Sequence, residues 1–473
     1  MSTAVVVGSG PNGLAAAAVL AKAGVQVTVV EAGPTLGGGA QSRELTLPGL
    51  VHDDSSGFHP LALGSAFAAE LDLAGAGLEW RWPDVQFSHP LDGGGGAALW
   101  RSVARTADGL GADGRAWSRV FGPLAERFDT IAPEFLQPVL HVPRHPVHLA
   151  RFGAYAGLPA TWLARAWSTE PGRALFAGAA AHAFRPLGTL ASSAIGVALT
   201  TAAHAFGWPV AAGGTGAITD AVLQRATEHG VRFETGRRVV DVRDLGEPDL
   251  VLLDTAPAAA ADILGDRLPA RVGRAYRRYR HGPGAFKVDY AVEGGVPWTH
   301  EPSRGAGTLH LGGSFEEVAA TEREVTRGRM PERPFVLVGQ QYVADPSRSV
   351  GDVHPLYAYA HVPAGFTGDA TEAVTAQIER FAPGFRERIR AVHVRSTADL
   401  ARNNANYVGG DIVTGANDAV QLVFRPRVAV DPYATGVPGV YLCSAATPPG
   451  AGAHGMCGYH AARSALDHLA SGR

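Results

Sequence analysis

Three glycines near the N-terminus restrict what this chain can fold into more than any other feature does. Gly8, Gly10 and Gly13 form a GxGxxG motif between an apolar, β-branched run at 4–7 and an Ala-rich segment at 14–23. In that order, such glycines permit a tight turn, a close approach to the backbone, and close strand–helix packing. We therefore predict a strand, a glycine turn and a helix whose N-terminus is free to bind phosphate.

The next residues complete a βαβ unit. Gly24 is placed to end the helix, and residues 25–30 form a second predicted strand. Glu31 ends that strand, where a carboxylate can accept hydrogen bonds from ribose hydroxyls. The pattern predicts a dinucleotide site, and an acidic Glu31 disfavours a 2′-phosphate there. Besides the glycines and Glu31, we expect this unit to contact the dinucleotide through Pro11, Asn12 and Ala32.

A second glycine cluster follows this unit at 37–39. Together with Ala40 it resembles the extended FAD fingerprint of the amine oxidase and phytoene desaturase superfamily. The resemblance implies FAD rather than NAD as the cofactor, with contacts from Gly38, Gly39 and Ala40. Relatives usually carry arginine after the glycine pair, where this chain has Gly39.

The C-terminal segment 440–460 reads as a strand, a Gly/Pro-rich loop and a helix. It resembles the closing motif of phytoene desaturase-like flavoproteins, most closely the subgroup of pyridine nucleotide-disulphide oxidoreductase domain-containing protein 2. The resemblance implies that the helix beginning near Gly455 and Met456 points at the flavin, where its positive end would stabilise the reduced, anionic ring. It also implies cofactor contacts from Ser444 and Ala445, which replace the usual acidic residue, and from Val239 and Thr255.

The two cysteines, Cys443 and Cys457, are not arranged as a CxxC pair. This spacing excludes a redox-active disulfide, and we predict no metal site. Redox chemistry would therefore come from the flavin. Only Lys22 and Lys287 are lysines among 41 basic residues, a bias typical of a bacterial genome with skewed base composition.

Lys287 is the first candidate catalytic residue. Its strand resembles the amine oxidase strand that carries a lysine bridged by water to flavin N5; a lysine at a strand edge is the alternative. His59 and His454 are candidate proton acceptors, because histidine titrates near neutrality. His52 and His460 are further candidates. The polar side chains of Asn403, Asn404, Asn406 and Tyr407 either line the substrate side or form an ordinary polar loop.

A chain of 473 residues with 46% hydrophobic residues is long enough for two or three domains. We predict an α/β fold with a Rossmann-type FAD-binding domain and a discontinuous α+β substrate domain. The expected elements include a largely helical segment at 65–206, a glycine turn at 93–96 and strands at 237–242 and 335–343. Compared with the family it resembles, the chain should have a reduced β-hairpin between 237 and 257. The first domain would use 1–70, 207–285 and 425–473, and the second 71–206 and 286–424. The net charge of −3 and the absence of a basic run argue against a nucleic-acid partner. A cytoplasmic location is expected, because the chain begins without a signal-peptide pattern.

These features predict an FAD-dependent oxidoreductase that dehydrogenates or desaturates a hydrophobic or natural-product-like small molecule. Two alternatives stay open: an amine-oxidase-like enzyme that oxidises C–N bonds with oxygen, and a non-catalytic flavin- or lipid-binding protein of the same fold. The sequence leaves the electron acceptor open between oxygen, a quinone and another molecule. It also leaves the oligomeric state open, and it gives no support to a peripheral membrane contact.

Overall fold

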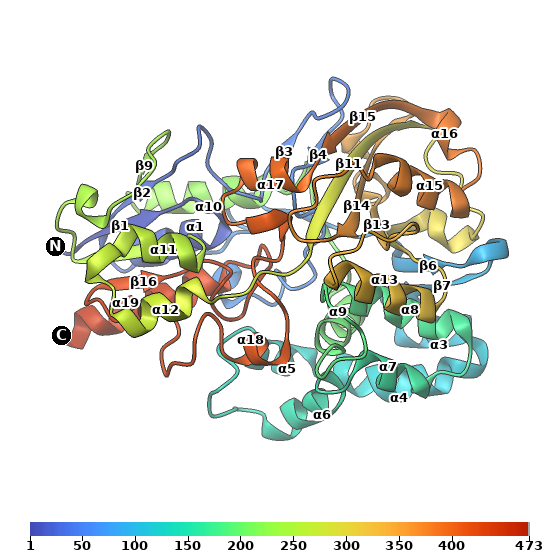
Figure 1. The fold of residues 1–473 in the computed structure, drawn as a ribbon, viewed down its shortest axis with the longest axis horizontal. Helices are drawn as coiled ribbons and strands as arrows, with labels where there is room; N and C mark the ends of the chain where they lie inside the picture. The colour runs from blue at the N-terminus through green and yellow to red at the C-terminus, as the bar shows by residue number, and fades with distance from the viewer. Residues whose placement is uncertain (472–473) are drawn as a thin grey trace.

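The computed structural model describes residues 1–471, which form two sheets and a layer of helices (Figure 1). A parallel sheet lies in the left part of the figure with the N-terminus and the C-terminal helix. A mixed sheet fills the upper right part, and most helices between residues 103 and 205 lie beneath it. Among residues 1–471, no helix is both long and apolar enough to cross a membrane.

The parallel sheet contains the predicted βαβ unit. Its strands follow the order β16 (Val440–Leu442), β10 (Leu250–Leu253), β1 (Thr3–Val7), β2 (Gln26–Val30) and β9 (Arg232–Glu234). Every neighbouring pair is parallel, so the carboxyl ends of all the strands meet at one edge. Segments from the beginning, middle and end of the chain thus converge at the edge where α/β sheets bind ligands.

Both faces of this sheet are covered because its strands are apolar on both sides. Val6, Val29 and Leu252 pack against the residues of α1 (Pro11–Lys22). Val7 and Leu253 point to the other face. Two further helices of the first face are α10 (Gly216–Glu228) and α19 (Met456–Ser471), and those of the second are α11 (Pro257–Leu264) and α12 (Ala270–Arg277).

The mixed sheet has seven strands, antiparallel except where β12 pairs with β6. Their order is β15 (Ile389–Arg395), β11 (Gly284–Glu293), β14 (Val353–Val362), β13 (Val336–Gly339), β12 (Ala306–Leu311), β6 (Val85–Pro90) and β7 (Gly96–Trp100). Even-numbered residues of β14, such as Ala358, pack with α15 (Thr371–Phe381). Tyr357 and Tyr359 point to the opposite face, toward the helical layer.

The remaining elements are short or belong to the helical layer. Two ribbons pair β3 (Ser42–Arg43) with β4 (His52–Asp53) and β5 (Trp80–Arg81) with β8 (Val210–Ala211). The other helices are α2 (Ala66–Glu70), α3 (Val103–Gly109), α4 (Gly114–Ala125), α5 (Phe128–Phe135), α6 (Pro146–Ala156), α7 (Ala160–Leu163), α8 (Glu170–Ala181), α9 (Ala194–Ala205), α13 (Phe315–Thr326), α14 (Gln341–Ala344), α16 (Phe385–Arg388), α17 (Thr397–Asn403) and α18 (Ala419–Val423).

The predicted elements are largely confirmed, including α1, the strands of the βαβ unit, and α19. A strand expected at 237–242 is wrong, because Asp241 instead caps a 3-10 helix over Val242–Leu245 by accepting a hydrogen bond from Arg243 N. The reduced hairpin expected in this region is confirmed. The strand expected at 335–343 ends at Gly339, because the buried Gln340 side chain bonds to Trp298 and turns the chain into α14.

The segment 65–206 is less uniformly helical than predicted, since it includes β5, β6 and β7. All six residues of β6 are buried, and the polar side chains of Gln86 and Ser88 are hydrogen-bonded inside the protein, to the carbonyl oxygen of Pro83 and to Ser303. The predicted glycine turn at 93–96 does connect β6 to β7. The two sheets draw on the segments expected for the two domains, whose boundaries stay a prediction.

Candidate active site

The three glycines of the turn between β1 and α1 occupy positions that have no room for a side chain. Gly8 has a φ of +99°, and a Cβ there would lie 2.9 Å from the carbonyl oxygen of Asp254. A Cβ on Gly13 would lie 2.2 Å from the carbonyl oxygen of Gly8. Gly10 precedes α1 without a side-chain cap. The N-terminus of α1 therefore combines a close approach to the backbone with N–H groups suited to an anion.

The second glycine cluster packs directly onto this turn. Gly38 has a φ of +56°, and a Cβ there would lie 2.9 Å from Gly10 Cα. At Gly39 a Cβ would lie 2.2 Å from the hydroxyl oxygen of Tyr407. The arginine that relatives carry after the glycine pair therefore has no space here unless Tyr407 moves. In this chain Tyr407 covers the place where that side chain would begin.

Glu31 lies at the end of β2, as predicted, with its carboxylate turned toward the glycine turn. It accepts hydrogen bonds from the backbone N–H of Ser9 at 2.8 Å, the Ser9 hydroxyl at 2.6 Å, and the backbone N–H of Gly33 at 2.7 Å. The N–H of Arg237 donates to the carbonyl oxygen of Glu31, which brings the segment containing Val239 past the end of β2. Ala32 is exposed at the same edge. These positions suit the adenosine contacts predicted for them.

Asp254 is a site residue that the sequence analysis missed. It follows β10, and its carboxyl Oδ2 accepts a hydrogen bond from the backbone N–H of Gly13 at 3.0 Å. A Cβ on Gly10 would lie 2.6 Å from the same oxygen. Burial, assisted by the charge of Glu31, raises the pKa of Asp254 to about 7. The chain thus places a carboxyl group, half protonated near neutrality, beside the expected phosphate position.

A small cavity of about 110 Å³ begins at this turn. Residues from three predicted segments line it together: Gly10, Pro11, Asn12, Gly39, Ala40, Ser444 and Ala445. Among residues 1–471, the buried Oδ1 of Asn12 and Oγ1 of Thr255 have no hydrogen-bond partner. A groove with a helix N-terminus, tight glycines and unsatisfied polar atoms fits a dinucleotide.

The asparagine side chains at 403, 404 and 406 hold or line the loops that form this groove. Asn406 accepts a hydrogen bond from the backbone N–H of Ala256 at 2.7 Å and donates one to the carbonyl oxygen of Asp254 at 3.0 Å. Asn403 donates to Asp54. Asn404 and Asn406 line the small cavity, whereas Tyr407 lines both this cavity and a larger one. The segment therefore positions the β10 loop, and only Tyr407 among these residues reaches the larger cavity.

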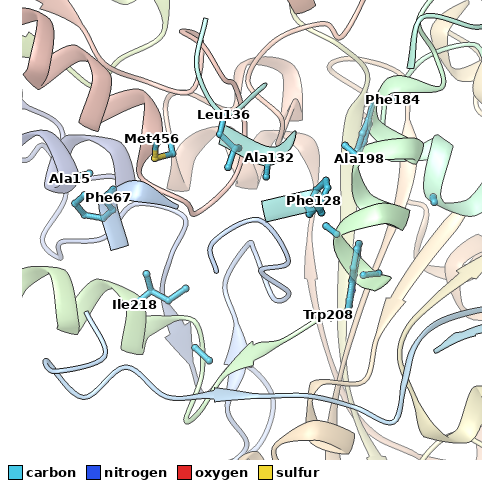
Figure 2. Close-up of a cluster of buried hydrophobic side chains, with 14 of the residues drawn as sticks. Ala15, Phe67, Phe128, Ala132, Leu136, Phe184, Ala198, Trp208, Ile218 and Met456 are labelled. Atoms are coloured by element: carbon cyan, nitrogen blue, oxygen red, sulfur yellow. The ribbon is translucent and has the colours of Figure 1, made fainter. Parts of the chain in front are cut away.

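The C-terminal loop and the start of α19 pack against α1, and one of the loop's N–H groups is engaged within the protein. The backbone N–H of Met456 donates to His454 Nδ1 at 3.1 Å. A Cβ on Gly455 would lie 2.5 Å from Phe67, and Figure 2 shows Met456 on the side of Ala15 and Phe67. Gly455 and Met456 therefore join α19 to α1 and α2, and their predicted contact with a flavin stays a prediction.

A cavity of about 640 Å³ adjoins the dinucleotide groove. Its walls are mainly apolar and aromatic, and include Phe58, Leu136, Phe152, Ile195, Trp208 and Tyr359. Three of the lining residues, Leu136, Ala198 and Trp208, are labelled in the cluster of buried hydrophobic side chains in Figure 2. His182 also lines the cavity, and burial lowers its pKa to about 3. Such a space suits a small organic molecule with limited polarity.

The two predicted histidines both line this cavity, and burial lowers the pKa of each to about 4. His59 Nε2 lies 3.0 Å from Thr215 Oγ1, and its Nδ1 lies 3.4 Å from Ser56 Oγ. Both ring nitrogens of His59 are thus engaged by the protein. His454 Nδ1 accepts the bond from Met456 N, which leaves Nε2 as its N–H donor. Neutral His454 is consequently better placed to donate a hydrogen bond than to remove a proton.

Lys287 lies on the face of the mixed sheet that carries Tyr357 and Tyr359, but it lines neither cavity. Its ammonium forms an ion pair with Asp289 and lies 4.4 Å from the centre of the Tyr357 ring. Burial lowers the pKa of Lys287 to about 8. Tyr357 thus stands between Lys287 and the cavity, and a structural role for the lysine becomes the simpler interpretation.

The other two histidine candidates, His52 and His460, form hydrogen bonds outside the dinucleotide groove. His52 Nε2 lies 2.8 Å from Thr46 Oγ1, and His460 Nε2 lies 2.9 Å from the carbonyl oxygen of Leu136. Among residues 1–471, no group of three or more His, Cys, Asp or Glu side chains is arranged to hold a metal ion.

Comparison with known proteins agrees with this geometry. A family model described as an NAD(P)-binding Rossmann-like domain matches residues 6–71, which contain the glycine turn, Glu31 and the second glycine cluster. Among solved structures, a redesigned putrescine oxidase superposes with a TM-score of 0.64 and 16% identity, covering 99% of each chain. The protein therefore has the fold of flavin-dependent amine oxidases.

Two curated proteins are similar in sequence over most of their length. Pyridine nucleotide-disulfide oxidoreductase domain-containing protein 2 of Rattus norvegicus is 25% identical over 548 residues, which cover 97% of this chain and 92% of that protein. Phytoene dehydrogenase of Streptomyces griseus is 28% identical over 386 residues, which cover 76% and 72%. The fold and these similarities are those of an oxidoreductase with a dinucleotide-binding domain.

Proposed function

We propose that this protein is an FAD-dependent oxidoreductase that dehydrogenates or desaturates a hydrophobic small molecule. The observation that carries the proposal is the continuity of the two cavities. Tyr407, Ile412 and the loop 451–453 line both of them. A dinucleotide that begins at the α1 N-terminus would therefore reach the apolar cavity with its far end, where a substrate has room.

The residues of the groove fit FAD along its length. The N-terminus of α1 would hold the phosphates, and Glu31 the adenosine ribose. Ser444, Ala445 and the loop 451–453 would hold the far end. When bound, FAD supplies hydride or electron acceptance at its ring, which the protein itself cannot provide.

The side chains of the large cavity would bind and orient the substrate. Its apolar walls exclude water, which favours a hydrophobic molecule by burial of apolar surface. His454 keeps an N–H at Nε2, because its Nδ1 accepts from Met456. His454 lines the large cavity, so this N–H lies on the cavity wall, near the carbonyl oxygen of Ala451. Both cysteines are buried and free, which supports a reducing compartment such as the cytoplasm.

The C–N oxidation alternative receives less support from the cavity. The aromatic walls could contact an ammonium group, but the Glu134 carboxylate, which would pair with its charge, is already occupied. It pairs with His141 and accepts hydrogen bonds from the backbone N–H groups of Arg144 and His145. We accordingly favour a neutral or anionic hydrophobic substrate over an amine.

Two measurements test the proposal. The purified protein should show a flavin spectrum and release FAD on heating; if it neither retains added FAD nor gains thermal stability from it, the proposal fails. Anaerobic screening should then find hydrophobic compounds that bleach the flavin band near roughly 450 nm. Bound FAD that dithionite reduces but no hydrophobic compound bleaches would favour the non-catalytic alternative. Hydrogen peroxide release on reoxidation would identify oxygen as the acceptor.

A further inference from the structure

Arg425 is a buried cation on the wall of the large cavity. Only 2% of its surface is exposed, and it lies between α18 and the C-terminal loop. Its Nε donates to the carbonyl oxygen of Gln421 at 3.1 Å, and its Nη2 to Oδ1 of Asn417 at 3.0 Å. Its Nη1 makes a long contact of 3.4 Å with the carbonyl oxygen of Ala445. All of these acceptors are neutral.

No carboxylate within residues 1–471 pairs with Arg425 at 4.0 Å or less. The buried Arg185 shares this feature, whereas two other buried arginines have carboxylate partners. Arg348 pairs with Asp53 and Asp345, and Arg395 pairs with Asp54. A buried charge without a counter-charge is costly, and the guanidinium has more N–H donors than Arg425 uses here. Arg425 therefore has both the charge and the free donors to bind an anion.

The surroundings of Arg425 add positive charge rather than cancel it. The Nη1 of Arg185 donates to the backbone carbonyl of Asn417, the residue whose side chain contacts Arg425. The nearby Asp418 carboxylate is engaged by Arg280 and by the first N–H groups of α18. Within the described chain, Glu134 is the only carboxylate that lines the large cavity, and its oxygens already accept hydrogen bonds from His141 and from the backbone N–H groups of Arg144 and His145. The Arg425 guanidinium thus lies on the cavity wall without an adjacent carboxylate.

We propose that the large cavity binds a hydrophobic carboxylic acid whose carboxylate pairs with Arg425. The inference rests on the proposed function in taking this cavity as the substrate site, and it adds the substrate class. Asn417 lies beside the guanidinium on the cavity wall and offers a second polar contact. The apolar side chains of α18 and of the helical layer would hold the rest of the molecule. A planar carboxylate matches the paired donors of a guanidinium better than it matches a lysine ammonium.

The test compares acids with alcohols of the same shape. The protein, loaded with FAD as purified, is titrated with octanoate and octan-1-ol, and with phenylbutanoate and phenylbutanol, by calorimetry and thermal shift. We expect at least one acid to bind roughly tenfold or more tightly than its alcohol, or about 1.4 kcal/mol. Equal binding of acid and alcohol in both pairs, or no binding of either acid at millimolar concentration, overturns the proposal.

Variants localise the effect. Arg425→Met should remove the preference for the acid, and Arg425→Lys should keep only part of it. Arg280→Met is the matched control, because Arg280 also contacts α18 but is exposed, with 60% of its side chain accessible. An acid preference that survives in folded Arg425→Met overturns the assignment to Arg425. If that variant does not fold, the result for Arg425→Lys decides: an unchanged preference overturns the assignment, and a weakened one supports it.

Flavin content, measured in the same samples, separates this proposal from the proposed function. An acid preference in a protein that binds no FAD supports the carboxylate subsite and refutes the flavoenzyme. Normal FAD binding and substrate-driven bleaching without an acid preference refute the subsite alone. Because Arg425 also lies near the loop expected to hold the flavin, the flavin spectrum of Arg425→Met is recorded as well. A shifted spectrum with an intact acid preference would assign Arg425 to the cofactor and overturn the subsite.

Discussion

The carboxyl Oδ2 of Asp254 accepts a hydrogen bond from the backbone N–H of Gly13 at 3.0 Å, so the end of β10 closes over the start of α1. That N–H belongs to the helix terminus expected to bind the phosphates of a dinucleotide. A carboxylate beside a phosphate repels it, whereas a protonated carboxyl can donate a hydrogen bond to it. The protonation state of Asp254 should therefore control this end of the site.

The first prediction concerns the pH dependence of FAD binding. Because burial raises the pKa of Asp254 to about 7, the protonated form prevails below that pH and the ionised form above it. If the protonated form binds FAD, the Kd should rise by up to about tenfold per pH unit above about pH 7. Asp254→Asn, which keeps the shape and an acceptor for Gly13 N, should abolish most of this dependence. Fluorescence titrations at several pH values measure it.

The same residue should affect stability. A carboxyl whose folded pKa is raised stabilises the fold below its unfolded pKa, and this contribution is lost as pH rises through the folded pKa of about 7. Asp254→Asn should therefore raise the thermal midpoint by a few degrees at about pH 8 and by much less at about pH 4. Asp262→Asn is the control, since 73% of its side chain is exposed. Identical pH profiles for the parent and Asp254→Asn would remove Asp254 from the site.

The second prediction concerns Gly10. Gly10→Val places a branched side chain where even a Cβ would lie 2.6 Å from Asp254 Oδ2, and where the pyrophosphate should approach the backbone. We expect loss of bound FAD, measured by absorbance after desalting, while circular dichroism remains that of a folded protein. Gly122→Ala is the control, because Gly122 lies in α4 with open space around it. That control should retain FAD and gain up to about 1 kcal/mol of stability. A Gly10→Val variant with normal flavin content would contradict the assignment.

Local features made the dinucleotide unit predictable, and long-range contacts hid the rest. The turn at Gly8–Gly13, α1 and Glu31 lie within one stretch of chain, so spacing alone indicated them. Asp254 meets Gly13 across 241 residues, and only the parallel pairing of β10 with β1 brings them together. Arg425 likewise could be identified only in the structure, because its distinguishing feature is that no carboxylate of the described chain pairs with it. The absence of a counter-charge in three dimensions leaves no mark in a sequence.

Lys287 shows the opposite case, because the spacing of Lys287 and Asp289 in the sequence already indicates the ion pair. Residues two apart on a strand point to the same face, so Asp289 was the natural partner of Lys287. The resemblance of this strand to the lysine-bearing strand of amine oxidases suggested a different partner. The ion pair found in the structure follows from the period of the strand alone.

The third prediction concerns Cys457, which we expect to be a packing residue. Burial raises the pKa of its thiol to about 12, so the reactive thiolate is absent near neutrality. Its Sγ lies 3.4 Å from the carbonyl oxygen of Thr447 and 3.3 Å from that of Gly450, which a serine hydroxyl can also approach. Cys457→Ser should keep the flavin spectrum and most of the turnover. Lost turnover with FAD still bound would indicate a chemical role for the thiol.

The last prediction separates two roles for Lys287. Burial alone would raise the pKa of Asp289, but the Lys287 ammonium, with the imidazoles of His52 and His393 at 3.6 and 3.7 Å, holds it well below its usual range. Lys287→Met would leave this carboxylate buried with its main counter-charge removed. We expect the free energy of unfolding to fall by about 3–5 kcal/mol, measured by urea denaturation with FAD in excess.

Replacing both partners provides the matched control. Lys287→Met combined with Asp289→Leu also removes the buried carboxylate that the single variant leaves unpaired, so it should recover much of the lost stability. A lysine that served flavin N5 would behave differently. Either variant would then slow flavin reduction or reoxidation by roughly tenfold or more, and the second substitution would not restore the rate. Stopped-flow traces of both half-reactions distinguish the two roles. Unchanged rates with lost stability establish that Lys287 acts in the ion pair. Slowed rates in the stable double variant would instead show that Lys287 acts at the flavin.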